Sequence, residues 1–379
     1  MQYLTGRLES LRKTVVIAIH RNIHELWRTT AGTGASILSA LSHLSSLPWL
    51  ARSKIERHLQ MISVYQWVIT FLIMGITCSI VMLYIFFTKF WPIAALYFSW
   101  LVIDWSTPKQ GGRRSEWVRN WAVWRYFREY FPIRLVKTHN LDPTRNYIFG
   151  CHPHGIFSFG AFCNFGTEAT GFSNKFPGIR PFLATLAGNF RMPILREYLM
   201  SGGIFPVTRE AIDFLLSKSG TGNAVIIVIG GSAESLNCSP GSNVVTLKNR
   251  KGFVKMALQN GADLVPVYTF GENDVYRQIV FKEGSLMRVI QRKFQKLIGF
   301  APCVFQGRGF FSSNSWGLVP YAKPINTVVG EPITVPQIEN PSQEEVDIYH
   351  KMYICSLGKL FNKYKTKFGY CETDRLKVI

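Results

Sequence analysis

The sequence predicts an α/β protein with a mostly parallel sheet flanked by helices, preceded by an N-terminal hairpin of two membrane helices. Two observations support this fold class. Beyond residue 140, short apolar runs alternate with helical segments, which is the pattern of a parallel sheet covered by helices. Before it, the chain from Leu59 to Ile103 is apolar and contains a single charged residue, Lys89.

The apolar stretch is long enough for two membrane helices, since one spanning helix needs about 20 apolar residues. We place the turn at Thr88–Pro92, because proline disfavours a continuing helix and Lys89 and Trp91 suit a membrane interface. The second helix is short for a full crossing, so a re-entrant hairpin stays open.

Basic residues outnumber acidic ones on both flanks of this stretch, in residues 1–58 and 104–137. Positive flanks favour the cytosolic side, so we expect an even number of crossings with both termini in the cytosol. The chain then divides into a partly flexible cytosolic extension (1–58), a membrane hairpin (59–104) and a cytosolic, membrane-associated domain (105–379).

Three tryptophans, Trp117, Trp121 and Trp124, recur at helical spacing directly after the hairpin. They predict one helix face that either packs in the core or lies in a membrane interface. Both interpretations stay open.

The chain is strongly basic, with 43 Lys and Arg against 23 Asp and Glu. Such a charge suits nucleic acid, anionic lipid head groups or phosphate-bearing ligands. We expect no nucleic acid, because zinc-finger spacing, RNP-like motifs and a basic helix-turn-helix are lacking. The seven cysteines are scattered without a Cys-x-x-Cys pair, which indicates a reducing compartment.

Short apolar runs at 147–149, 224–229 and 264–270 predict buried strands, and residues 252–259 predict a helix. In parallel sheets the ligand site lies at the carboxyl ends of the strands. Because one motif follows the first strand and another follows the second, we expect the two loops to form one site.

The first motif, His152-Pro153-His154-Gly155, is the most informative stretch of the chain. Histidine has an ordinary pKa of about 6.5, which suits proton transfer near neutrality. The competing interpretations are a histidine satisfied within the core and a metal site. The metal site lacks a third ligand at suitable spacing.

The second motif, Gly230-Gly231-Ser232-Ala233-Glu234, brings a carboxylate to the same edge of the sheet. Glu234 is either a solvated turn residue or a group that orients His154 or stabilises its imidazolium. Cys151 is disfavoured as a thiol nucleophile, because neighbours on a strand point to opposite faces. Serine-hydrolase, P-loop and dinucleotide-binding motifs are lacking.

With these motifs the chain resembles the type 2 diacylglycerol O-acyltransferases, a group that also holds monoacylglycerol acyltransferases and wax synthases. The resemblance covers most of the chain from about residue 30. The blocks that carry it are Tyr130-Phe131-Pro132, His152-Pro153-His154-Gly155, Gly230-Gly231-x-x-Glu234, Arg250-x-Gly252-Phe253-x-Lys255-x-Ala257, Val265-Pro266, Phe270-Gly271-Glu272 and Val329-Gly330-Glu331-Pro332.

The resemblance implies a glycerolipid-acyltransferase-like fold and acyl-CoA-dependent esterification of diacylglycerol to triacylglycerol. A neutral histidine would take the proton of the acceptor hydroxyl as its oxygen attacks the thioester, without an acyl-enzyme. His154 is the expected base, because it directly precedes an expected helix at Gly155, and His152 is the fallback. Main-chain N–H groups at Gly155 or at Gly230-Gly231 are the expected oxyanion donors.

Two departures from the pattern of related acyltransferases indicate which acceptor the protein uses and which carboxylate is the partner of the base. The wider glycerolipid acyltransferases use His-x4-Asp, whereas a phenylalanine stands five residues beyond each histidine here, so we expect Glu234 to be the carboxylate partner. Those relatives also follow their Glu-Gly-Thr block with an Arg that holds the acceptor's phosphate. Here Ser235-Leu236 follow Glu234, which suits an acceptor without phosphate.

Both substrates need contacts elsewhere in the chain. The family's neutral-lipid pattern Phe-Leu-x-Leu appears here with Met in its last position, so we expect Phe71, Leu72 and Met74 to contact lipid. The phosphates of CoA need cations, and Arg250 and Lys251 at the start of helix 252–259 are the expected contacts. A solvated basic turn is the alternative.

The expected partners are acyl-CoA, diacylglycerol and membrane lipid, and a homo-oligomer stays open. Acyl-CoA is a substrate, so we expect no cofactor and no metal. The resemblance places the protein at the endoplasmic reticulum membrane and the lipid droplet surface. The alternatives are monoacylglycerol or a long-chain alcohol as acceptor, a non-catalytic hairpin protein of lipid droplets, and a metal-dependent lipid hydrolase.

Overall fold

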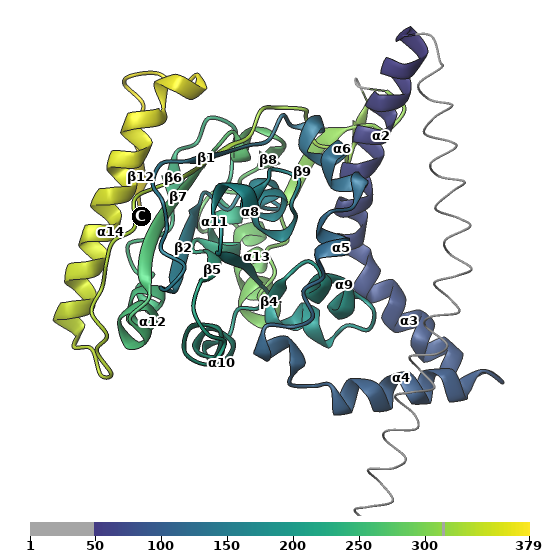
Figure 1. Cartoon of the computed structure of the whole chain (residues 1–379). Helices are drawn as coiled ribbons and strands as arrows, with labels where there is room; N and C mark the ends of the chain where they lie inside the picture. The colour runs from purple at the N-terminus through teal and green to yellow at the C-terminus, as the bar shows by residue number, and fades with distance from the viewer. Residues whose placement is uncertain (1–48, 313–314) are drawn as a thin grey trace, which may run out of the picture. The chain divides into compact units, whose positions relative to one another are not determined.

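A computed structural model describes residues 49–312 and 315–379, with side chains from residue 55 onwards (Figure 1). The chain divides into two compact units, Met1–His58 and Leu59–Ile379. Residues 1–48, most of the predicted cytosolic extension, lie outside the described residues. The second unit carries the sheet, its covering helices and both motifs.

The central sheet has seven strands in the order β1-β11-β7-β2-β5-β3-β4. Every neighbouring pair is parallel except β7 and β11, so the prediction of a mostly parallel sheet is confirmed. The strands are β1 (Arg134–Lys137), β2 (Tyr147–His152), β3 (Arg180–Thr185), β4 (Ile204–Pro206), β5 (Asn223–Val228), β7 (Asp263–Phe270) and β11 (Asn326–Val329). The three predicted strands correspond to β2, β5 and β7.

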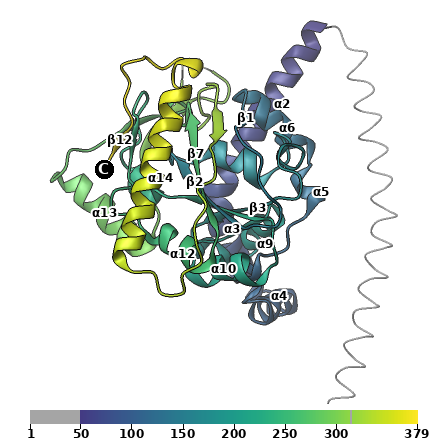
Figure 2. The ribbon, with the colours of Figure 1, turned by 60° about the vertical axis from the view of Figure 1, so that its left-hand side comes forward.

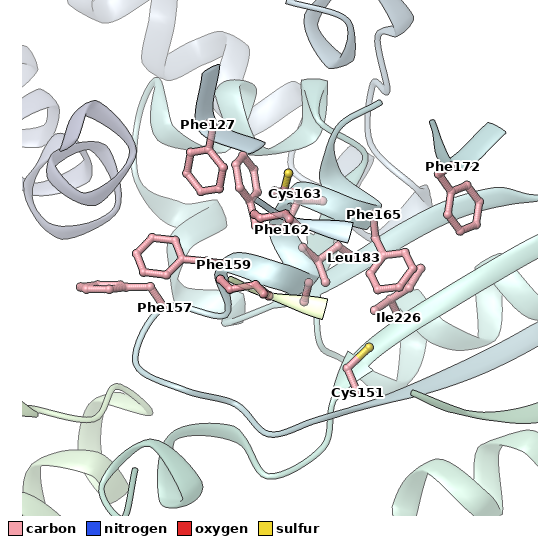
Figure 3. Close-up of a cluster of buried hydrophobic side chains, with 14 of the residues drawn as sticks. Phe127, Cys151, Phe157, Phe159, Phe162, Cys163, Phe165, Phe172, Leu183 and Ile226 are labelled. Carbon is pink, nitrogen blue, oxygen red and sulfur yellow. The ribbon is translucent and has the colours of Figure 1, made fainter. Parts of the chain in front are cut away.

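Side chains of the central strands divide between two apolar layers, because successive residues of a strand point to opposite faces. Phe149 and Cys151 belong to one layer and Ile148 to the other. The first layer is rich in phenylalanine, including Phe159 and Phe162 from the chain after the His-Pro-His-Gly loop (Figure 3). The loop therefore stands on a packed aromatic base.

Helices cover both faces of the sheet, with α12 and α14 on one side and α2 and α6 on the other (Figure 1). They are α5 (Glu116–Arg119), α6 (Ala122–Tyr130), α7 (Phe159–Ala161), α8 (Phe172–Lys175), α9 (Leu195–Ser201), α10 (Arg209–Asp213), α11 (Gly231–Ser235), α12 (Gly252–Asn260), α13 (Leu286–Ile298) and α14 (Gln343–Tyr364). π-helical turns follow α7 (Phe162–Gly166) and α10 (Phe214–Lys218), and a 3₁₀ turn, η4 (Ala187–Arg191), precedes α9. The predicted helix 252–259 is confirmed as α12.

Two short strand pairings lie outside the main sheet. β8 (Arg277–Ile279), β9 (Val304–Arg308) and β10 (Trp316–Gly317) form a small antiparallel sheet. β6 (Val244–Val245) pairs in parallel with β12 (Lys377–Val378), close to the end of the chain. The second pairing fixes the segment that follows the Gly-Gly-x-x-Glu loop.

An apolar helix from Ile55 to Phe86 is long enough to cross a membrane. It consists of α2 (Trp49–Ile69), a π-helical turn (Thr70–Met74) and α3 (Gly75–Phe86). The chain then turns and continues as α4 (Trp91–Ile103), which contacts α3. The turn lies close to its predicted position, while a two-helix membrane hairpin stays a prediction.

The apolar helix has two different surroundings along its length. In its first half, Val64, Trp67 and Val68 are buried against the α/β domain, and the Trp67 ring stacks on Phe162 with 3.5 Å between centroids. In α3 and α4 the apolar side chains are largely exposed, among them Ile76, Ile80, Leu83, Tyr84, Ile93, Leu96, Val102 and Ile103. Within residues 59–88, most of the exposed apolar side chains thus belong to the second part, although Ile62 in the first part is exposed as well.

The prediction that Trp117, Trp121 and Trp124 lie on one continuous helix is wrong. The chain breaks between α5 and α6, because α5 ends at Arg119 and Trp121 is extended rather than helical. Trp124 is buried in the core, whereas Trp117 is 70% exposed. The stripe is therefore split between a core position and a surface position.

Candidate active site

The two motif loops meet at the carboxyl ends of neighbouring strands. β2 and β5 pair in parallel, with Cys151 opposite Val228, so both chains leave the sheet at the same edge. His154 follows β2 by two residues, and α11 follows β5. The predicted juxtaposition of the loops is thus what the structure contains.

His154 is a half-buried side chain whose ring is held through Nδ1. That nitrogen lies 2.7 Å from Ser235 Oγ, 3.1 Å from the carbonyl oxygen of Gly155 and 3.4 Å from Ser158 Oγ. A carbonyl only accepts, so the network favours the tautomer with the proton on Nδ1. Nε2 then carries the lone pair that can take a proton. Burial lowers the pKa of His154, which keeps the ring neutral at physiological pH.

His152 has a different environment from His154. It is fully buried, and its Nε2 lies 3.2 Å from the hydroxyl of Tyr353 on α14. Burial lowers the pKa of His152 to about 3. The ring is therefore a neutral part of the core, and its position does not suit proton exchange with a substrate.

Glu234 reaches the His154 residue, but not its ring. Its carboxylate accepts the main-chain N–H of His154 at 2.5 Å and that of Thr246 at 2.6 Å. Burial raises the pKa of Glu234 to about 7. Our expectation of a Glu234–imidazole contact is corrected here: the carboxylate orients the backbone of the loop, and the neutral Ser235 hydroxyl is the ring's partner.

The glycines of both motifs permit close approach of carboxylates. Gly155 has φ +61°, and a Cβ there would lie 2.8 Å from Cγ of Glu272. A Cβ on Gly230 would collide with the carboxylate of Glu234. Gly231 has φ +56° and open space around it. Larger residues at Gly155 or Gly230 would displace the two carboxylates that fix the loops.

The expected helix start at Gly155 is wrong. Residues 155–157 form a turn, and α7 begins at Phe159. Its first N–H groups, on Phe159 and Gly160, are already bound by the carboxylate of Glu272 at 2.7 and 2.8 Å. These N–H groups are therefore not available to an oxyanion, because both already donate hydrogen bonds to the carboxylate of Glu272.

Sequence reasoning missed Ser235 and Glu272 as site residues. Glu272 is buried, and burial raises its pKa to about 7. A signal existed for both. Ser235 follows Glu234 directly, and Glu272 lies just beyond the carboxyl end of β7, which pairs with β2. Hydroxyl and carboxyl groups at the ends of strands adjoining the histidine strand are candidates for its support.

Arg250 and Lys251, the two cations expected to bind the phosphates of CoA, have different surroundings. Lys251 forms an ion pair with Asp347 on α14, with 2.7 Å between Nζ and Oδ1. Arg250 is exposed, and its charge acts on Glu234 by lowering that carboxyl's pKa against the larger effect of burial. Arg250 is thus the better-placed cation of the pair near the motif loops.

The expected lipid-contacting residues lie where the apolar helix passes the site. Phe71, Leu72 and Met74 are partly buried and pack on the phenylalanine-rich layer. The Phe71 ring contacts that of Phe157, with 5.8 Å between centroids. Because Phe157 belongs to the turn after His154, this contact joins the helix to the His-Pro-His-Gly loop.

The other chemistries that the sequence left open gain no support from the site. Cys151 is buried in the apolar layer on the face opposite to His152, and burial raises the pKa of its thiol. Across the described part of the chain, no group of three His, Cys, Asp or Glu side chains is arranged to hold a metal ion.

Comparison with known proteins assigns the chain to a family. A family model described as diacylglycerol acyltransferase matches residues 83–379. The human protein named diacylglycerol O-acyltransferase 2 is 70% identical over 347 residues, covering 92% of this chain and 89% of that protein. The Xenopus tropicalis protein of the same name is 69% identical and covers 92% and 96%. This chain belongs to the diacylglycerol acyltransferase family.

Two further likenesses are weaker. A human protein named 2-acylglycerol O-acyltransferase 3 is 51% identical, covering 88% of this chain and 97% of that protein. The crystal structure of the 1-acyl-sn-glycerophosphate (LPA) acyltransferase PlsC from Thermotoga maritima has 12% identity and a TM-score of 0.35, covering 81% and 97%. The second likeness is too low to support a conclusion about this chain.

The match to the diacylglycerol acyltransferase family includes every side chain that holds the His154 ring or its loop. His154, Ser235, Glu234 and Glu272 all lie within residues 83–379. Phe71 and its neighbours precede that range, but the 347-residue alignment to the human relative extends well beyond it.

Proposed function

We propose that this protein transfers the acyl chain of acyl-CoA to the free hydroxyl of diacylglycerol and so forms triacylglycerol. Nε2 of His154 removes the hydroxyl proton while the alcohol oxygen bonds to the thioester carbonyl carbon. The carbon–sulfur bond then breaks, and CoA leaves as a thiolate that takes up the proton from His154. No acyl-enzyme forms, in accord with the burial of Cys151.

The arrangement around His154 is the observation that carries this function. A base for an alcohol must be neutral and must present a lone pair. Burial keeps the ring neutral, and the Gly155 carbonyl together with Ser235 engages Nδ1. We assign the oxyanion donors to main-chain N–H groups of the Gly230-Gly231 loop, where open space around Gly231 leaves room for a substrate.

Diacylglycerol is the preferred acceptor on two grounds. Ser235 and Leu236, which follow Glu234, are both buried and uncharged, in keeping with an acceptor that has no phosphate. Identity to the proteins named diacylglycerol O-acyltransferase 2 is about 70%, against 51% for the protein named 2-acylglycerol O-acyltransferase 3. Phe71 at the catalytic loop supplies an apolar contact for the acceptor's chains.

The protein acts at a membrane, which we take to be that of the endoplasmic reticulum and the surface of lipid droplets. The exposed apolar faces of α3 and α4 enter the lipid, and tryptophans at the ends of α4 suit the interface. At 1.5 Å per residue these helices are about 18 and 20 Å long, below the ~30 Å of a hydrocarbon core. Neither α3 nor α4 alone spans that core, but α3 continues the longer helix that begins at Ile55. We place the two as a hairpin whose flanks both stay on the cytosolic side.

The deciding experiment measures acyl transfer from labelled oleoyl-CoA, with diacylglycerol, monoacylglycerol and a long-chain alcohol offered in parallel. We expect triacylglycerol as the main product, and a loss of about 10²–10⁴-fold in His154→Ala. Full activity in His154→Ala would remove the assigned base. A chelator should change nothing, whereas inhibition would support the metal-dependent alternative.

Topology needs a separate measurement, because activity does not report it. Asn237 stands in a glycosylation sequon, and Cys355 on α14 is exposed. In sealed microsomes Asn237 should carry no sugar, and Cys355 should react with a membrane-impermeant maleimide. Sugar on Asn237 would place the catalytic domain in the lumen.

A further inference from the structure

Helix α13 has the reverse of the usual surface pattern. Its polar residues Arg288 and Gln291 are buried, at 2% and 4% exposure. Its apolar residues face outward, with Leu286 at 74%, Ile290 at 50% and Leu297 at 84%. Figure 2 shows α13 at the outer edge of the domain. An ordinary surface helix would bury such an apolar face, because exposure of each side chain is unfavourable.

The apolar side chains of α13 form a continuous stripe. With 3.6 residues per turn they occupy roughly a third of the helix circumference. The stripe consists of Leu286, Met287, Ile290, Phe294, Leu297 and Ile298, all exposed. On the other exposed side of the helix stand Lys293 and Lys296, with Arg292, which forms an ion pair with Glu283, and Val289. An apolar stripe beside a basic one is the pattern of a helix that lies in a lipid interface.

The inner side of α13 contacts α11 and the residues that follow it. Gln295 donates to Ser232 Oγ at 2.9 Å, and Arg288 donates to the carbonyl oxygen of Leu236 at 3.0 Å. Arg288 also binds the side chain of Asn237. These partners lie in α11 or directly after it. Since α11 also carries Glu234 and Ser235, the helix that holds His154 is itself held by α13.

A segment of the chain links the carboxyl end of α13 to the helices α3 and α4. At its carboxyl end, Leu186 packs against Gly299, where a Cβ would lie 2.7 Å from Leu186 Cδ1. Leu186 leads into η4 and then to Met192, whose side chain packs against Gly75 at the start of α3. Ile194, 45% exposed, follows and donates its N–H to Tyr97 of α4. The lipid-facing surface of α3 and α4 is thus connected to α13 through residues 186–194.

We propose that α13 docks on the lipid surface and couples that docking to the position of α11, and so to the base His154. The occupant of the stripe is a lipid interface with anionic head groups rather than a second protein, because basic side chains flank the stripe and residues 186–194 link its carboxyl end to α3 and α4. The coupling part rests on the proposed function, since it concerns the access of diacylglycerol to His154. The docking part does not.

Docking is tested with the full chain reconstituted in phosphatidylcholine–phosphatidylserine vesicles. A bimane label is placed at Leu297→Cys in a chain whose exposed or partly exposed Cys78, Cys303, Cys355 and Cys371 are replaced by serine. The matched control is a second chain with native Leu297, in which Cys355 of α14 is kept and carries the label while Cys78, Cys303 and Cys371 are replaced by serine. Vesicles with brominated acyl chains should quench the label at 297 and leave the label at 355 unquenched. Equal fluorescence at 297 with and without bromine would overturn the docking.

A protein occupant gives a different result in the same samples. If a second copy covered the stripe, the label at 297 would be shielded in detergent as well as in vesicles, and bromine would have no effect. In vesicles without phosphatidylserine, quenching at 297 should persist but be weaker. This result would assign the basic side chains a supporting role, as expected from their position beside the stripe.

Coupling is tested by activity on two forms of diacylglycerol. In the variant Phe294→Ser/Leu297→Ser, the vesicle concentration that gives the half-maximal rate should rise on the order of tenfold, because apolar contact area is lost. The rate on diacylglycerol dispersed in detergent should stay unchanged. Met352→Ser on α14, which removes a similarly exposed apolar side chain, is the control and should behave as wild type.

The hydrogen bond between Gln295 and Ser232 is tested separately, by the maximal rate. Gln295→Ala removes the hydrogen bond to Ser232 and should lower the maximal rate on both forms of diacylglycerol. Gln295→Glu, which can accept a hydrogen bond from the Ser232 hydroxyl, should restore part of that rate. An unchanged maximal rate in Gln295→Ala would overturn the coupling. If the wild type makes no triacylglycerol at all, the proposed function fails, while the quenching result still decides the docking.

Discussion

At the residue scale, neutral groups support the ring of His154, the base that we propose. The ring of His154 is bound by a hydroxyl and a carbonyl, while the nearest carboxylate, Glu234, binds main-chain N–H groups. A neutral partner stabilises an imidazolium less than a carboxylate does. In the mechanism that we propose, the proton therefore passes from His154 to the leaving thiolate, whose own affinity for protons is higher.

Ser235 should act as a positioning residue. In Ser235→Ala the ring keeps only the Gly155 carbonyl as a strong partner, so the maximal rate should fall about fivefold, the equivalent of one hydrogen bond of about 1 kcal/mol. The Michaelis constant for acyl-CoA should stay unchanged, since Ser235 is buried. Ser235→Thr, which keeps the hydroxyl, should recover part of the rate. Equal losses in both variants would point to packing instead.

The pH dependence of the rate should have an acid limb with two contributions. His154 must be deprotonated, and its pKa lies below 6.5, so this requirement alone preserves activity down to mildly acidic pH. Glu234 has a pKa of about 7, and its protonation on acidification removes an acceptor from the N–H groups of His154 and Thr246. We therefore expect the rate to decline as pH falls through about 7.

The variant Glu234→Gln separates the two contributions. It cannot titrate at position 234, so its remaining activity should lose the limb near pH 7 and decline only below the pKa of His154. Rates measured from acid to neutral pH in both proteins decide the matter. An acid limb near 7 that persists in Glu234→Gln would assign it to another group.

At the element scale, the site depends on segments distant in sequence. β12 pairs with β6, and the Ile379 carbonyl accepts the N–H groups of Leu247 and Lys248, both at 2.9 Å. Thr246, between these residues, donates to Glu234. The last residues of the chain thus fix the segment that holds the carboxylate.

Deletion of residues 377–379 should therefore lower activity about tenfold or more, because several main-chain hydrogen bonds of about 1 kcal/mol each are lost. Lys377→Ala is the matched control, since it keeps the main chain and changes only an exposed side chain. The assay is triacylglycerol formation in microsomes at equal protein levels. Wild-type rates in the deletion variant would show that β6 holds Glu234 unaided.

At the scale of the whole molecule, one apolar helix serves two purposes. Its first half completes the core of the α/β domain, and α3 with α4 presents apolar surface outward. The first half contains the charged residues Glu56 and Arg57, whereas α3 contains no charged residue, and their contacts differ in the same way.

Thermal unfolding in detergent should reveal the difference. Trp67→Ala should cost about 3–5 kcal/mol, because it leaves a cavity against Phe162. Ile80→Ala, on the same helix at 63% exposure, should change the free energy of unfolding by about 0.5 kcal/mol or less. Similar losses for the two variants would mean that α3 is packed on protein as α2 is.

The sequence by itself predicted the parallel sheet, the strands β2, β5 and β7, and the meeting of the two motif loops. These depend on local patterns: apolar runs give buried strands, and parallel strands bring their carboxyl ends to one edge. The resemblance added the expected chemistry, which the comparisons support through the family to which the chain belongs.

Only the tertiary structure decided which side chains face each other at that edge. His152 and His154 are indistinguishable by residue type, yet one points into the core against Tyr353 and the other toward Ser235. The partners Tyr353, Ser235 and Glu272 come from α14, α11 and the end of β7. No local pattern encodes these contacts, because burial and hydrogen-bond geometry depend on segments that meet only when the chain folds.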